Sequence, residues 1–146
     1  MRWRIKARNV PGRVATGAYI AHAGYEKWHG TPERAAGVHT MASGAFPVLE
    51  PIPSAAFLKV LAAGELATGG LLLNPLTSNR VAGLALTGFA GSLLAMYWRT
   101  PTMRKPGSVW PTPAGMAVSK DVWMLGIGLG LLADPGRRAT SRPRRR

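Results

Sequence analysis

The run from Val81 to Trp98 constrains the fold most, because its eighteen residues carry no charged side chain. A transmembrane helix needs about 20 mostly apolar residues. The aromatic pair Tyr97 and Trp98 at the end of this run is typical of the boundary between lipid and water. The run therefore predicts a membrane-spanning helix. A buried helix of a soluble bundle is the alternative, but so small a soluble domain has little core to cover such a helix.

Three further apolar segments are candidates for additional membrane-spanning helices. Each contains or adjoins ionisable side chains, and they cover Val14–Trp28, Phe57–Leu73 and Val118–Ala133. Between the first two, Thr31 and Pro32 form an N-cap and a first-turn proline, which predict a short interfacial helix. The sequence thus predicts an all-α, integral membrane four-helix bundle with that short helix between spans one and two.

Small residues four positions apart let membrane helices approach closely. Gly126 and Gly130 have this spacing in the last segment, as do Gly17 with Ala21 and Gly88 with Ser92. We expect these pairs to lie at helix contacts.

Positive charge is concentrated at the two ends of the chain. The net charge is +13, from 19 basic and 6 acidic residues, and eleven of the basic residues lie within 1–13 and 136–146. Basic flanks are retained on the cytoplasmic side. We therefore expect a basic cytoplasmic tail over 1–12, a membrane domain over 13–133 and a basic, disordered cytoplasmic tail over 134–146. Such tails would contact anionic lipids, and nucleic acid is not expected as a partner.

Ionisable groups inside a bilayer are costly and are functional candidates. Glu65 lies deep in its span, and Tyr19, His22 and Glu26 share one face of the first helix. With Lys27 they form the candidate polar site, which could bind a quinone head or relay a proton. The alternative is that Glu65 pairs with Lys27, or with a helix backbone, only to hold the bundle together.

Other chemistries have little support in the sequence. The chain has no cysteine, which excludes disulfides and thiolate nucleophiles. The three histidines form no recognisable haem-ligand arrangement, and no pattern indicates a metal. Lys120 and Asp121 are predicted to anchor the fourth span at the interface, as are Trp98, Trp110 and Trp123.

The order of short motifs along residues 13–133 resembles the DoxX family of small four-helix bacterial membrane proteins. The motifs are Arg13 with Gly17 and Gly24–Lys27, then Glu65–Leu73, then Asn79–Gly83, then Ser119 with Lys120. The family includes a subunit of a thiosulfate:quinone oxidoreductase and a membrane anchor of redox-protective enzymes.

The resemblance implies a bacterial plasma-membrane protein with both termini in the cytoplasm. It also implies a membrane subunit or scaffold of a redox system, either quinone-linked or protective against oxidative stress. Such a chain could be a non-catalytic subunit of an oxidoreductase, with redox enzymes or further copies of itself as partners. The alternatives are a small-molecule transporter or channel, and a membrane-anchored structural protein without chemistry of its own.

Overall fold

A computed structural model describes residues 6–134, and this part of the chain is built from helices and loops. The main helices are α1 (Val10–Trp28), α3 (Ser54–Leu73), α4 (Asn79–Arg99) and α6 (Val122–Ala133). The shorter ones are α2 (Pro32–Ala45), α5 (Met116–Ser119), and the 3-10 turns η1 (Ala7–Asn9), η2 (Pro47–Leu49) and η3 (Pro101–Met103). No strand is formed within residues 6–134. The prediction of an all-α chain is confirmed.

Within residues 6–134, three segments are long and apolar enough to cross a membrane. They are α3, α4 and Met116–Ala133, which combines α5 and α6. The sequence predicts four spans, and α1 is the helix that is not among the three. Its 19 residues include Arg13 near the start and Glu26 and Lys27 near the end, which make it less apolar than the others.

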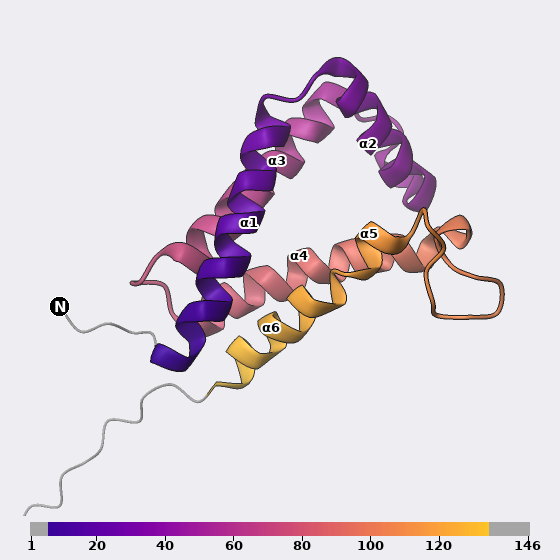
Figure 1. Cartoon of the computed structure of the whole chain (residues 1–146). Helices are drawn as coiled ribbons and strands as arrows, with labels where there is room; N and C mark the ends of the chain where they lie inside the picture. Colours follow the sequence, from indigo (N-terminus) through magenta and orange to yellow (C-terminus); the bar gives the residue numbers. More distant parts are fainter. Residues whose placement is uncertain (1–5, 135–146) are drawn as a thin grey trace, which may run out of the picture.

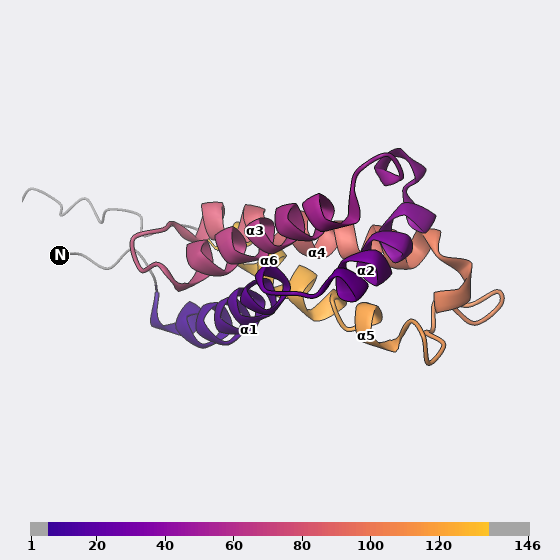
Figure 2. The same ribbon diagram turned by 90° about the horizontal axis from the view of Figure 1, so that it is seen from above.

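The main helices pair into two arms that diverge from a common end (Figure 1). In the first arm α1 packs along α3, and in the second arm α4 packs along α6. The arms meet at the turn between α3 and α4, and α2 bridges their open end (Figure 1). From above, α3 and α4 lie in one layer, and α1 and α5 lie in the other (Figure 2).

Glycines set the closest approach within the first arm. A Cβ atom added to Gly69 of α3 would lie 2.8 Å from the backbone nitrogen of Ala21 and from the backbone oxygen of Gly17. One added to Gly24 of α1 would lie 2.9 Å from the backbone nitrogen of Leu66. The predicted contact at Gly17 and Ala21 is thus confirmed, and α3 is the partner.

In the second arm the predicted glycines are the wrong ones. A Cβ atom added to Gly126, Gly130 or Gly88 would meet no atom within 4 Å. The close contact is instead at Gly128, between Gly126 and Gly130. A Cβ atom added there would lie 2.9 Å from the backbone nitrogen of Thr87. Spacing alone could not choose between these faces of α6, because a helix of alternating leucine and glycine offers small residues on several sides.

Arg13 fastens the start of α1 to the end of α3. Its side chain is only 1% exposed and donates five hydrogen bonds. The acceptors, at 2.9–3.0 Å, are the backbone oxygens of Leu71, Leu72, Asn74 and Thr77 and the side-chain oxygen of Asn79. The last carbonyls of a helix lack partners within it, so one guanidinium here satisfies acceptors that lipid could not.

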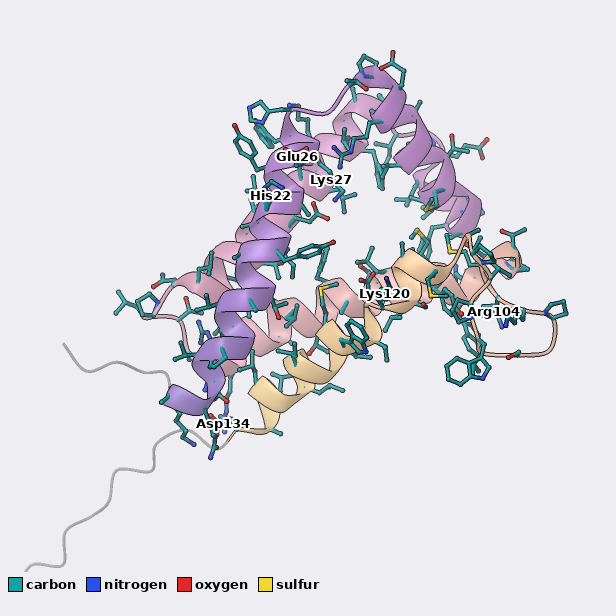
Figure 3. All side chains as sticks on the ribbon, viewed as in Figure 1. His22, Glu26, Lys27, Arg104, Lys120 and Asp134 are labelled. Atoms are coloured by element: carbon teal, nitrogen blue, oxygen red, sulfur yellow. The ribbon has the colours of Figure 1, made fainter. Side chains whose placement is uncertain are left out.

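A second polar cluster lies beside Arg13 and surrounds Asp134. The Asp134 carboxylate accepts hydrogen bonds from Lys6 (2.6 Å), Arg8, Asn9 (2.7 Å) and Asn79 (2.9 Å). The Lys6 ammonium is the main group that holds the pKa of Asp134 well below its usual range, with Arg8, Asn9 and Asn79 adding to the effect. The cluster joins residues from both ends of the described chain, and Figure 3 shows Asp134 where the two arms meet.

The helix predicted after Thr31 is present as α2, and the Thr31 hydroxyl accepts a hydrogen bond from the Arg34 backbone nitrogen. Its position relative to a membrane stays a prediction. The end of α2 reaches the second arm, where the Arg99 guanidinium lies 5.0 Å from the centre of the Phe46 ring. Of the tail predicted over 1–12, the structure describes 6–12, which include η1 and the start of α1. Of the tail predicted over 134–146, it describes Asp134, and 135–146 lie outside the described residues.

Candidate functional site

The two arms and α2 enclose a cavity of about 450 Å³, here called the central cavity. Its walls are largely apolar. The apolar lining is Ile20, Ala23, Val38, Met41, Ala42, Phe46, Leu49, Phe57, Leu61, Phe89, Leu93, Met96, Ala117, Val118 and Met124. The polar lining is Tyr19, Lys27, Glu65, Ser92 and Asp121. A mostly apolar cavity with a few convergent polar groups is the usual form of a small-molecule site, and this volume is in the usual range.

An ion pair between the two helices of the first arm lines this cavity. The Lys27 Nζ atom of α1 lies 2.8 Å from Oε1 and 2.9 Å from Oε2 of Glu65 on α3. The Glu65 residue is 5% exposed, and the Lys27 side chain is 17% exposed. The close approach at Gly24 brings the backbones near enough for this pair, because a Cβ there would lie 2.9 Å from that of Glu65. The predicted pairing of Glu65 with Lys27 is therefore confirmed.

Asp121 places a second carboxylate on the cavity wall from the opposite arm. It lies at the break between α5 and α6 and lines the cavity together with Lys27 and Glu65. The sequence predicts that Asp121 anchors the fourth span at the interface together with Lys120. Of the two, Asp121 lines the cavity and Lys120 does not. The sequence signal at Asp121 is a carboxylate directly before an apolar helix, but its place on the cavity wall depends on how that helix packs.

The shared face of Tyr19, His22 and Glu26 does not meet Glu65. His22 is exposed, and Glu26 is exposed and lies 3.8 Å from Arg34 in an ion pair. Tyr19 borders the cavity but is 72% exposed. Figure 3 shows His22 and Glu26 on α1 with Lys27 close by. The face that meets α3 contains Gly17 and Gly24 instead, because only glycine allows the backbones to come so close.

The histidines are spread over separate contacts. His29 Nδ1 lies 3.0 Å from the Tyr25 backbone oxygen, and His39 Nε2 lies 3.0 Å from the Leu49 backbone oxygen. Within residues 6–134, no three histidine, aspartate or glutamate side chains gather into a group that could hold a metal ion.

The chain matches no protein-family model, no curated protein and no solved structure. Its function must therefore be inferred from the central cavity, where one ammonium and two carboxylates face an apolar space. An ammonium group can donate to a carbonyl oxygen of a bound molecule, and a carboxylate can accept a proton from it or return one.

Proposed function

We propose that this chain is a DoxX-like, four-span protein of the bacterial plasma membrane and serves as a membrane subunit of a quinone-linked redox system. The observation that carries the proposal is the Lys27–Glu65 ion pair, which lines an apolar cavity between helices suited to a bilayer. Intramembrane ionisable residues are rare and mark functional sites by default.

The contacts of α1 support its role as the fourth span. Arg13 donates to acceptors on α3 and the following turn, and Lys27 is paired with Glu65. Charged groups that are paired within a bundle cost much less in lipid than isolated ones. The bonds from Lys6 and Arg8 to Asp134 bring the two ends of the described chain together. That arrangement suits an even number of spans, with both termini on the cytoplasmic side.

The chemistry of the central cavity supports a quinone as the ligand. A quinone head is flat and apolar, with two carbonyl oxygens that accept hydrogen bonds. The aromatic and aliphatic walls would hold the ring, and the Lys27 ammonium would donate to one carbonyl. Reduction to the quinol consumes two electrons and two protons. The two electrons would come from a redox partner and the two protons from water, and we assign Glu65 and Asp121, which face the same space, to take up those protons and pass them to the ring oxygens.

A charge-neutral replacement of the ion pair tests this proposal. We expect Lys27→Gln/Glu65→Gln to weaken binding of a short-chain quinone analogue about tenfold, because it removes the charged donor to the quinone carbonyl. The affinity would be measured by calorimetric titration of the purified protein in detergent. The matched control is Glu26→Gln/Arg34→Gln, which neutralises an exposed ion pair that also involves α1.

The control is expected to keep the affinity of the parent protein. If the parent, the cavity variant and the control all bind the analogue equally, the quinone site is wrong. The Lys27–Glu65 ion pair would then serve only to hold α1 against α3, which is the alternative given with the candidate polar site.

A further inference from the structure

A second hollow lies at the far end of the second arm from Asp134. It has a volume of about 680 Å³ and is here called the tryptophan groove, after Trp98, Trp110 and Trp123. These three side chains are 58%, 69% and 70% exposed. Large apolar side chains gathered on one exposed surface mark a site of interaction with another molecule or with a membrane.

The loop after α4 is held in place to form one wall of the groove. The Tyr97 hydroxyl donates to the Val109 backbone oxygen at 2.8 Å, and the Lys105 backbone nitrogen donates to the Trp110 backbone oxygen at 2.9 Å. The Arg104 guanidinium lies 4.4 Å from the centre of the Trp98 ring. Figure 3 shows Arg104 at this loop and Lys120, which lies in the turn between α5 and α6. The groove is therefore a shaped surface in which hydrogen bonds hold the loop and the Arg104 guanidinium packs on Trp98.

The groove lies where two candidate membrane spans end. The span of α4 ends at Arg99, and the last span begins at Met116, so the groove joins the end of one to the start of the other. Tryptophan at this level is typical of the headgroup region of a bilayer. The side chain of Trp123, one residue into α6, continues the apolar wall from this level into the span.

Two lysines give the groove a positive charge. Lys105 and Lys120 both line it, and no carboxylate does. Within the part of the chain that the structure describes, neither lysine takes part in an ion pair. Lysines close to an anionic membrane surface each strengthen binding on the order of fivefold. The groove thus combines a cationic end with an apolar wall that leads towards the bilayer.

We propose that the tryptophan groove binds one anionic phospholipid. The phosphate lies between Lys105 and Lys120, and an acyl chain runs along Trp123 and Leu94. The charge of the two lysines selects an anion, and the apolar wall selects one that carries a hydrocarbon chain. A free phosphate ion would leave the tryptophans exposed, and a zwitterionic lipid would leave the lysines without net compensation. This site is separate from the central cavity and does not depend on the quinone proposal.

Quenching of tryptophan fluorescence by brominated lipids tests the proposal. The full chain with Trp3→Phe and Trp28→Phe would retain only the three groove tryptophans. It would be reconstituted with brominated phosphatidylglycerol or brominated phosphatidylcholine at equal fractions. We expect the anionic lipid to associate about twenty-five-fold more strongly, the combined effect of two lysines. Lys105→Gln/Lys120→Gln should abolish this preference.

Two controls separate a specific site from general attraction to positive charge. Arg34→Gln/Arg80→Gln removes two cations elsewhere and should keep the preference, and so should the charge-conserving Lys105→Arg/Lys120→Arg. Equal quenching by the two lipids would overturn the proposal. A preference that survives in Lys105→Gln/Lys120→Gln, or one that added inorganic phosphate abolishes, would overturn it as well.

Discussion

Replacement of Arg13 by methionine is expected to lower the free energy of unfolding by about 3–5 kcal/mol, among the largest effects of any single substitution in this chain. The methionine fills a similar volume but donates no hydrogen bonds. The backbone oxygens of Leu71 and Leu72 and three further acceptors would lose their donor at a position that is 1% exposed. The measurement is the free energy of unfolding in detergent, followed by the loss of helical circular dichroism.

We expect Arg13→Lys to lower the free energy of unfolding as well. A lysine ammonium has three donors and cannot reach the acceptors at the end of α3 as the planar guanidinium does. The control is Arg34→Met, which removes an exposed arginine whose ion pair with Glu26 spans 3.8 Å. Exposed pairs contribute about 0–1 kcal/mol, so this variant should remain close to the parent. Equal stability of Arg13→Met and Arg34→Met would show that the Arg13 bonds do not fasten α1 to α3.

Replacement of Gly69 by leucine is expected to force the helices of the first arm apart, at a cost of about 3 kcal/mol. An added Cβ would lie 2.8 Å from backbone atoms of Ala21 and Gly17. Backbone atoms of a packed helix cannot move aside as a flexible side chain can. The spacing of the two helices can be followed by cross-linking of single cysteines placed on α1 and α3, since the chain has none of its own.

The neighbouring Gly70 provides the matched control. A Cβ at Gly70 would meet no atom within 4 Å, so Gly70→Leu should keep both the stability and the cross-linking of the parent. The two substitutions add the same side chain to adjacent positions of one helix. Similar behaviour of the two variants would contradict the close crossing of α1 and α3.

Helix positions could be predicted from the sequence because apolar length and capping are local properties. The run from Val81 to Trp98 lies within α4, and Thr31 is the N-cap of α2, as its hydroxyl and the following proline indicate. The pairing of Glu65 with Lys27 was also open to prediction, since a charged residue in an apolar span needs a partner.

The arrangement of the helices could not be predicted in the same way. Tyr19, His22 and Glu26 share one side of the first helix, which predicts that this side faces Glu65. The close approach at Gly69 turns a different face of α1 inwards. Asp121 could not be placed, because its role depends on how α6 lies opposite the first arm. Such contacts depend on the packing of distant segments and leave little local trace.

Labelling of a single cysteine in the central cavity shows whether a quinone binds between the two arms. Ser92 lines the cavity from α4, and Ala95 lies on the same helix outside the cavity lining. We expect a saturating short-chain quinone to slow thiol modification of Ser92→Cys and to leave thiol modification of Ala95→Cys unchanged. Unaltered modification of Ser92→Cys in the presence of the quinone would contradict a quinone site between the two arms.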